Sequence, residues 1–407
     1  MRHHVLFLLT ITVAFTSSNA RGDEPSAEIT PDGEQLTPQA TVISNELRNA
    51  FAPDSEPIVM LDAIIDGTAL GGYGGWFPMS KANSRFEWLA IADTFDANSD
   101  QKITREEFGG NGNDFARLDR NGDKQLSSDD FDWTESSLER TPGYMMFFMA
   151  DRDANGKVTR EEFSALYDQV AGRNASYLTL DDLRDQFQPP DTVDHERRAN
   201  RPSRSTLIAA LQRQEIGSLQ SGPRVGEIAP DFSLVDLNGK TVTLSDEVGE
   251  KPIVLIFGNF TCGPFRSQSG NIEKLYRTYQ ERAKFFLVYV REAHPSDGWQ
   301  MASNQRVGID VPQPTSQDGR RKVAQQCQSH LDMDLPFLVD DVGDTVGEMY
   351  SGMPNRLYLI DRQGNVAFRN GRGPYGFHPR ELEQALILLL RDDREDGQKD
   401  AGPKSGF

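Results

Sequence analysis

Cysteine and excess positive charge are both scarce in this sequence. Only two cysteines, Cys262 and Cys327, occur among 407 residues, so a small scaffold held together by several disulfides is excluded. Lysine and arginine total 43 against 62 aspartates and glutamates, which gives a net charge of -19 at pH 7. Because a phosphate backbone recruits basic side chains, we expect no nucleic-acid partner. An acidic chain of this kind suits a cation-binding protein better.

Long apolar runs are also missing. The run from Val5 to Phe15 is shorter than the ~20 residues that cross a bilayer, and no later stretch is long enough. Arg2 precedes this run and the small residues Ser18 to Ala20 follow it, which is typical of a secretory signal peptide over residues 1–20. We therefore expect an exported protein, periplasmic or secreted, with no membrane span after cleavage; an uncleaved anchor is the alternative. In an oxidising compartment the two cysteines either pair or remain apart.

One stretch places a cysteine where a nucleophile is often found. The apolar run Ile253 to Phe257 is followed by Gly258, and Cys262 stands shortly before a helix expected over residues 268–283. A thiol at a helix N-terminus meets unpaired N–H groups and the positive end of the helix dipole, which favour the thiolate and lower the thiol pKa. Cys262 is therefore a candidate nucleophile. The alternative is a buried structural cysteine.

Residues 84–188 repeat an acidic pattern three times. In a twelve-residue EF-hand loop, oxygens at positions 1, 3, 5 and 12 and the backbone carbonyl of position 7 surround a calcium ion. Loops one, two and three run over residues 96–107, 119–130 and 151–162. The expected ligands are Asp96, Asn98, Asp100, Lys102, Glu107, Asp119, Asn121, Asp123, Gln125, Asp130, Asp151, Asp153, Asn155, Lys157 and Glu162. Three tandem matches favour calcium binding over acidic turns without a metal.

Aliphatic residues at position 8 predict that the loops pair. Ile103, Leu126 and Val158 occupy this position, which lies in the short strand that joins two loops of a pair. Three loops therefore imply a fourth hand. A loop aligned on Leu178 lacks ligand side chains at positions 1, 3 and 5, so we expect a degenerate hand that binds no metal.

Two departures from the loop pattern predict an order of calcium affinity. Position 6 usually carries glycine, but loops one and two carry Gln101 and Lys124 there, at a cost of about 1 kcal/mol in a left-handed conformation. Loop two also ends in Asp130, which is shorter than glutamate, whereas loop three keeps Gly156 at position 6. We expect loop three to bind calcium most tightly and loop two least tightly.

From residue 225 onward the pattern changes to alternating strands and helices. The expected elements are a hairpin over 232–244 with an Asn238–Gly239 turn, strands over 253–257, 285–290, 337–339 and 357–360, a hairpin arm over 366–368, and helices over 268–283, 319–330 and 379–390. Strands that alternate with helices and end in a hairpin and a helix predict an α/β sandwich of thioredoxin type.

The predicted architecture is therefore multidomain, with an all-α EF-hand domain followed by an α/β thioredoxin-like domain. The expected divisions are a signal peptide at 1–20, a leader and unassigned segment at 21–83, the EF-hand domain at 84–188, a Pro-, Arg- and Gln-rich linker at 189–223, the thioredoxin-like domain at 224–393 and a polar tail at 394–407. A short helix is expected within the linker, around Leu207 to Leu211.

Three short blocks of the C-terminal domain carry a family likeness. They are Phe257 to Phe265, which contains Cys262, then Glu292 to Trp299, and Pro354 to Tyr358. Together they resemble the iodothyronine deiodinase family, over about residues 225–390. Members of that family reductively remove iodine from an aromatic ring with selenocysteine. Cys262 stands at the selenocysteine position in this sequence.

The resemblance implies a role for each of five residues. Cys262 would attack a halogen or a peroxide. His294 would contact a phenolic oxygen or relay a proton, which suits a side chain that titrates near neutrality. Glu292 would orient His294, and Thr261 would hydrogen-bond to the sulfur. Arg356 would hold an anionic group of the substrate.

The sequence also departs from the family pattern. Sulfur is less nucleophilic and less acidic than selenium, so dehalogenation should be slower. Phe260 and Leu335 replace two helper cysteines of the family, and Phe265 fills the second cysteine position of a Cys-x-x-Cys motif. Cys327 is then the internal candidate for resolving an oxidised Cys262. Family members are also held in membranes by an N-terminal helix, in place of which this sequence has a signal peptide and EF-hands.

The leading hypothesis is an exported calcium-binding protein whose C-terminal domain is a deiodinase-like thiol oxidoreductase. It would use Ca2+, an external thiol reductant and an aromatic halide; a homodimer is left open. The first alternative is a thiol peroxidase, in which peroxide converts Cys262 to a sulfenic acid. The second is a calcium-regulated binding module without enzymatic activity, whose redox fold is vestigial.

The order of calcium affinity can be tested one loop at a time. We expect Asp151→Ala to cause the largest loss of calcium affinity among single replacements of the first aspartate in each loop, because loop three combines glycine at position 6 with glutamate at position 12. Calcium titration of the three variants checks this order. Full affinity in the Asp151→Ala protein would contradict it.

Overall fold

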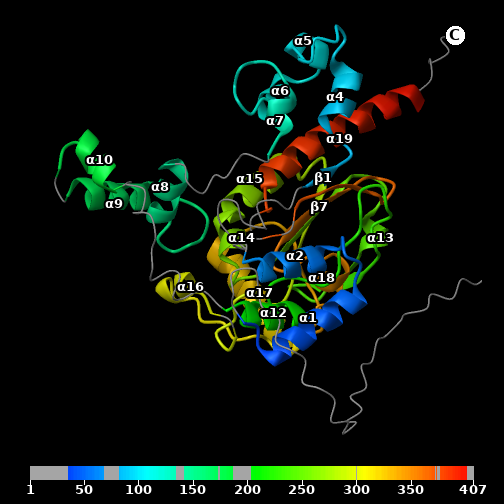
Figure 1. The fold of residues 1–407 in the computed structure, drawn as a ribbon. Coiled ribbons are helices and arrows are strands. Elements are labelled where there is room, and N and C mark those ends of the chain that lie inside the picture. The colour runs from blue at the N-terminus through cyan, green and yellow to red at the C-terminus, as the bar shows by residue number, and fades with distance from the viewer. Residues whose placement is uncertain are drawn as a thin grey trace, which may run out of the picture.

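A mixed eight-stranded sheet is the centre of the structure (Figure 1). The computed structural model describes residues 35–67, 82–133, 142–172, 175–186, 203–298, 300–371, 373 and 376–400. The strands are β1 (Asn83–Ser84), β2 (Ser233–Asp236), β3 (Thr241–Thr243), β4 (Ile253–Gly258), β5 (Lys284–Tyr289), β6 (Phe337–Val339), β7 (Arg356–Ile360) and β8 (Val366–Arg369). Their order is β1-β8-β7-β4-β5-β6-β2-β3. Strands β4, β5 and β6 are parallel, and the remaining pairs are antiparallel.

The topology confirms the predicted thioredoxin-like α/β fold. Strand β4 is joined to its parallel neighbour β5 through α14 (Gly263–Ser267) and α15 (Ser269–Tyr279), and the β7–β8 hairpin on the other side of β4 leads into α19 (Pro379–Asp400). The remaining helices of this body are α13 (Leu244–Glu247), α16 (Ala302–Arg306), α17 (Gln317–Leu331) and α18 (Thr345–Met349). The helix expected over 268–283 is α15, and the short helix α14, which was not predicted, precedes it; the two are separated at Gln268, whose N–H bonds to the carbonyl of Phe265 at 3.1 Å.

The two faces of β4 bury different hydrophobic clusters. Val254 and Ile256 point into the cluster formed with α15, α17 and α19, whereas Leu255 and Phe257 point into the cluster formed with α13 and α18. This alternation follows from the period of two in a strand. Because both faces are covered, the strand is apolar along its whole length, as expected for a central parallel strand.

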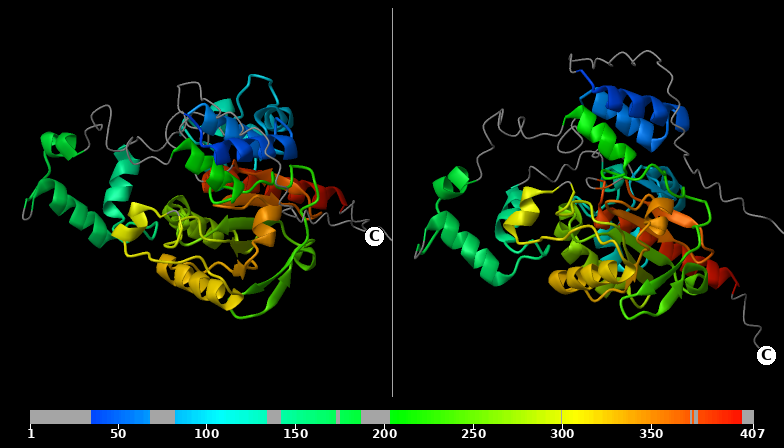
Figure 2. Two further views of the ribbon diagram at one scale, coloured as in Figure 1. Left: turned by 60° about the horizontal axis from the view of Figure 1, so that its bottom comes forward. Right: turned by 90° about the horizontal axis from the view of Figure 1, so that it is seen from below.

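Three helices from the N-terminal half and the expected linker form a separate small core. They are α1 (Pro38–Ala50), α2 (Glu56–Ile65) and α12 (Arg204–Gln212), and Figure 2 shows them together on one side of the sheet. Leu61 and Ile208 are fully buried between them. Helix α12 confirms the short helix expected around Leu207 to Leu211, whereas the polar composition of the linker and leader did not reveal that this helix packs against α1 and α2. Residues 204–212 are thus packed against α1 and α2 rather than free.

The first two acidic loops lie against α19. They are flanked by α4 (Trp88–Phe95), α5 (Arg105–Phe108), α6 (Gly112–Leu118) and α7 (Ser128–Phe131). Ile103 and Leu126 exchange two backbone hydrogen bonds of 2.9 Å, as expected for residues at position 8 of paired loops. The guanidinium of Arg391 on α19 stacks on Phe95 and Phe108. This helical pair therefore shares the hydrophobic cluster of the sheet and does not form a core of its own.

Loop three connects two helices on another side of the sheet body, near α14 and α16 (Figure 1). These are α8 (Pro142–Ala150) and α9 (Arg160–Ala171), and α10 (Leu180–Gln186) follows the expected degenerate loop. Arg173 of that loop, the signal peptide expected at residues 1–20 and the end of the polar tail lie outside the described residues. Within the described part of the chain, no helix is both long and apolar enough to cross a membrane.

Candidate active site

Cys262 lies between β4 and α14, at the carboxyl end of a central parallel strand. It is the N-cap residue of α14, and its side chain is 1% exposed. The side-chain amide of Asn355 donates a hydrogen bond to Cys262 Sγ, with the two atoms 3.2 Å apart. Asn355 directly precedes β7, which pairs with β4, so the sheet itself brings the two residues together. The sequence singled out this block but not Asn355 as the partner of the sulfur.

Burial decides the protonation of Cys262. Loss of water raises the pKa of the thiol to about 11, although the N–H of Phe265, the amide of Asn355 and the charge of Arg266 all favour the thiolate. The predicted lowering of this pKa is therefore wrong. Helix α14 has only five residues, so few peptide dipoles add up at its N-terminus.

The three sequence blocks meet at the side chain of Asn259, which is fully buried. Its Oδ1 accepts hydrogen bonds from Thr261 Oγ1 at 3.2 Å and from the N–H of Ala293 at 3.1 Å. Its Nδ2 donates to the carbonyl of Pro354 at 2.9 Å. One amide thus connects the Cys262 loop to the two loops that carry His294 and Asn355. Sequence analysis placed Asn259 in the first block without giving it a role.

Glu292 holds the backbone beside the sulfur and does not orient His294 as predicted. Its carboxylate is 3% exposed and accepts hydrogen bonds from the N–H of Thr261, at 2.9 Å, and from the hydroxyl of Tyr289. Burial raises the pKa of Glu292. Tyr289 in turn accepts from the N–H of Phe260 at 3.0 Å. The carboxylate therefore fixes the chain just before Cys262.

The hydroxyl of Thr261 does not bond to the sulfur, which corrects a second expectation. It donates to Asn259 and accepts from the N–H of His294 at 3.0 Å. Thr261 is 1% exposed, so the hydroxyl is a buried structural connection between the nucleophile loop and the histidine loop.

His294 is half-buried and lines a cavity beside the nucleophile loop. The cavity has a volume of about 480 Å³ and is lined by His294, Ser296, Gln300, Met301, Asn304, Gln305, Gly308, Ile309 and Asp310. Asn304 links the cavity to the active site, because its Nδ2 donates to the carbonyl of Thr261 at 2.8 Å. The pocket thus ends one hydrogen bond away from the residue that precedes Cys262.

Arg266 is a site residue that the sequence analysis missed. It lies four residues after Cys262 and is 2% exposed. Its guanidinium donates to the carbonyl of Phe260 at 2.6 Å and to Asn304 Oδ1 at 2.7 Å. Among the described residues it forms no ion pair, so a buried positive charge stands next to the thiol. The i, i+4 spacing from Cys262 was the one signal in the sequence that could have identified it.

Arg356 is already occupied by a carboxylate of the protein itself. Its side chain is 1% exposed, and its Nη2 lies 3.1 Å from Oε1 of Glu56 on α2. The guanidinium expected to hold a substrate anion is thus paired with an acidic side chain of the protein. Glu56 comes from the segment to which the sequence analysis assigned no function, and such a long-range pair leaves no local pattern.

Cys327 lies on α17 as a fully buried free thiol, and Cys262 is also free. Burial raises the pKa of the Cys327 thiol well above its usual range. The structure thus holds both cysteines in reduced form, and neither is poised as a surface thiolate.

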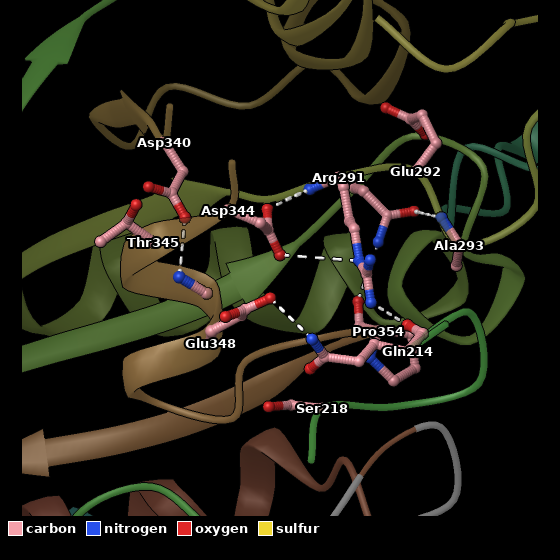
Figure 3. A network of polar contacts seen from close by, with 12 residues as sticks. Gln214, Ser218, Arg291, Glu292, Ala293, Asp340, Asp344, Thr345, Glu348 and Pro354 are labelled. Carbon is pink, nitrogen blue, oxygen red and sulfur yellow. Dashed lines mark hydrogen bonds and ion pairs between the residues drawn. The ribbon is translucent and has the colours of Figure 1, made fainter. Parts of the chain in front are cut away.

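A polar network anchors the start of the loop that carries Glu292 and His294 (Figure 3). The N–H of Arg291 donates to Oδ1 of Asp344 at 2.7 Å, and its guanidinium donates to the carbonyl of Gln214. The side chain of Gln214, just after α12, donates to Glu348 on α18 at 2.7 Å. The small helical core is thereby tied to the end of β5.

All three acidic loops adopt the same backbone conformation at position 6. Gln101, Lys124 and Gly156 have φ values of 67°, 69° and 77°, in the left-handed region. The N–H of each donates to the aspartate at position 1 of its loop, at 2.9 to 3.0 Å. The strain expected for Gln101 and Lys124 therefore applies, since residues with a Cβ disfavour this region.

Loop three brings three carboxylates together. Asp151, Asp153 and Glu162 offer oxygens that all lie within 4.8 Å of one another. Asp151 is buried, which raises its pKa to about 6. No comparable group of three is found in the described residues of loops one and two. In loop two, Asp130 accepts hydrogen bonds from three backbone N–H groups and is fully buried.

The sheet topology and the buried cysteine after β4 define a thioredoxin-like redox domain. A profile of the iodothyronine deiodinase family matches residues 183–388, which is just over half of the chain. This chain therefore belongs to the iodothyronine deiodinase family, as its three sequence blocks predicted.

Individual relatives match part of the chain. It is 29% identical to the type I iodothyronine deiodinase of Xenopus laevis over 163 residues, which is 40% of this chain and 62% of that protein. It is 32% identical to the thyroxine 5-deiodinase of Gallus gallus over 183 residues, which is 44% of this chain and 69% of that protein. A putative protein disulfide isomerase structure from Bacteroides thetaiotaomicron aligns with a TM-score of 0.32 and 20% identity, covering 43% of this chain and 95% of that one.

The hydrogen bond from Asn355 predicts a measurable effect on the thiol. Because the pKa of Cys262 is raised to about 11, its alkylation rate in the native protein should rise about tenfold per pH unit between pH 7 and 9. Asn355→Ala should slow alkylation about tenfold at each pH, since a hydrogen bond to a charged group contributes roughly 1.5–3 kcal/mol. Iodoacetamide labelling followed by mass spectrometry measures both rates.

Asn271→Ala, on the exposed side of α15, is the matched control and should label like the wild type. A rate that levels off below pH 8, or an Asn355→Ala protein that labels at the wild-type rate, would contradict this account of the thiol.

Proposed function

We propose that this protein is an exported thiol oxidoreductase that removes halogen reductively from an aromatic ring at Cys262. The observation that carries the proposal is the hydrogen bond from Asn355 to Cys262 Sγ, beside a cavity lined by His294. Asn355 can stabilise a thiolate when the substrate enters, and Met301 and Ile309 are the apolar side chains that the otherwise polar cavity offers to an aromatic ring. Membership of the family supports this reaction class.

The proposed reaction has two steps. The Cys262 thiolate attacks the halogen, an S–halogen bond forms, and the carbon–halogen bond breaks, while the ring carbon accepts a proton that His294 can relay. A first external thiol then attacks the sulfur and releases halide, and a second one releases Cys262 from the mixed disulfide. In sum, the aryl halide and two thiols give the arene, a disulfide and hydrogen halide.

The reductant is proposed to be external for a structural reason. Cys327 is fully buried on α17, and both thiols are free. An internal disulfide would require the buried Cys327 to reach Cys262, whereas a small external thiol needs only the path that the substrate uses. Since Cys262 itself is 1% exposed, this path must open for either molecule.

An assay with an iodinated phenol and a dithiol tests the reaction. Cys262→Ser should reduce iodide release to background, and His294→Gln should lower kcat by about 10²–10⁴-fold if it relays the proton. Cys327→Ser should retain activity, because the reductant is external. The same samples are then assayed with hydrogen peroxide. Peroxide turnover without iodide release would favour a thiol peroxidase. A Cys262 that is inert in both assays would favour a non-enzymatic module.

Calcium binding is proposed for the helical hands, with loop three as the principal site. The threefold EF-hand pattern supports it, and so do the close carboxylates of Asp151, Asp153 and Glu162. These hard oxygen ligands suit Ca2+ better than a transition metal. Loop two is proposed as the weakest site, because Asp130 at position 12 is shorter than glutamate and is fully buried. The titration of Asp151→Ala described above is the test.

Export is proposed from the N-terminal pattern of Arg2, the apolar run and Ser18 to Ala20. The protein recovered from the periplasm or the medium should begin at Arg21, because the small residues before it suit signal peptidase. N-terminal sequencing checks this, and an intact Met1 on the exported protein would contradict cleavage.

A further inference from the structure

Loop three is in direct contact with the helices that follow the nucleophile. The hydroxyl of Ser269, at the start of α15, donates to the backbone carbonyl of Asn155 at 2.5 Å. The ring of His330 on α17 bonds through Nε2 to the carbonyl of Asp153 at 3.0 Å. The ammonium group of Lys157 donates to the carbonyl of Asp332 at 2.7 Å. Positions 3, 5 and 7 of the loop, all expected calcium ligands, thus each bond to the redox domain.

Two glycines allow the backbones to touch. A Cβ on Gly156 would lie 2.0 Å from the carbonyl oxygen of Arg266, and a Cβ on Gly270 would lie 2.5 Å from the carbonyl oxygen of Gly156. Both approaches are too short for any side chain. Loop three and the α14–α15 junction therefore fit together as closely as two backbones can. Among the described residues, loops one and two form no hydrogen bond with α14, α15 or α17.

The contact reaches Cys262 through Arg266. The backbone carbonyl of Arg266 touches loop three, and its guanidinium holds the carbonyl of Phe260 at 2.6 Å. Through Asn304 it also supports the carbonyl of Thr261. The two residues before Cys262 are thus positioned by an arginine that rests on loop three. A movement of the loop at Gly156 would shift this arginine and the nucleophile loop with it, because packed interiors transmit strain.

The charge of a cation bound in loop three would also act on Cys262. Loop three contributes the carboxylates of Asp151, Asp153 and Glu162, and a divalent cation would cancel two of these negative charges. Less negative potential near Arg266 favours the anionic form of a neighbouring thiol, because an opposite charge stabilises a thiolate and a like charge opposes it. Calcium in loop three should therefore raise the reactivity of Cys262.

We propose that loop three is a calcium-responsive support for the nucleophile, in which the bound ion activates Cys262 through Ser269, Gly156 and Arg266. This inference rests on the proposed calcium binding of loop three. It assigns a regulatory ligand to the redox site, with Arg266 as a positioning residue. Loops one and two, which lie against α19 instead, have no part in the response.

The test compares the thiol reactivity of the full chain with calcium and with a chelator. Alkylation of Cys262 by iodoacetamide at pH 8, followed by mass spectrometry, should be at least about fivefold faster with calcium, as expected for an ordinary coupling between two sites. Asp151→Asn should abolish the acceleration. Ser269→Ala should bind calcium but respond less. Asp168→Asn, an exposed carboxylate on α9 outside the loop, is the charge-matched control and should respond like the wild type.

Calorimetry separates this inference from the calcium proposal itself. A heat of calcium binding that is present in the wild type and reduced in Asp151→Asn establishes binding to loop three. If calcium then leaves the alkylation rate of Cys262 equal or makes it slower, the coupling alone is overturned. If Asp151→Asn binds as much calcium as the wild type, both proposals are wrong. Circular dichroism confirms that each variant is folded, and hydrogen exchange of residues 260–269 provides a second readout, with slower exchange expected when calcium is bound.

Discussion

The Cys262 site depends on the burial of the polar loop that follows β4 and contains Asn259, Thr261 and Cys262. Such burial is tolerated only where each polar group finds a partner. Asn259 satisfies three of them at once, from the Cys262 loop, the His294 loop and the segment before β7. The geometry of the nucleophile follows from this arrangement, because the Cys262 loop is hydrogen-bonded both to the His294 loop and to the segment before β7.

Desolvation and local charge oppose each other at Cys262. Burial raises its pKa to about 11, while Asn355 and Arg266 favour the thiolate. A buried positive charge without an ion pair is costly, and the cost is reduced in part because the two Nη groups of Arg266 donate to the carbonyl of Phe260 and to Asn304 Oδ1. The result is a thiol that is protonated at rest and has the partners of a thiolate in place. This arrangement suits a nucleophile that reacts only when its surroundings change.

The helical segments surround the redox domain instead of standing apart from it. Glu56 on α2 neutralises the buried Arg356, and Gln214 after α12 holds Arg291 at the end of β5. Arg391 of α19 packs between aromatic rings beside loop one, and loop three touches the α14–α15 junction. A thioredoxin-like core thus carries partners on several sides, and the small helical core and loop three contact segments close to the site.

The sequence by itself determined the strands and hairpins of the C-terminal domain and the class of that domain, because the period of two and the turn residues are local signals; the edge strand β1 comes from the N-terminal half and was not predicted. It also placed Cys262 after β4 and gave loop three the glycine that its left-handed φ requires. Tertiary structure decided the rest. Asn355 and Glu56 reach the site from positions that share no local pattern with Cys262, and the pKa of Cys262 depends on burial that only packing creates. The helix start predicted a reactive thiolate, and desolvation by the folded protein reversed that prediction.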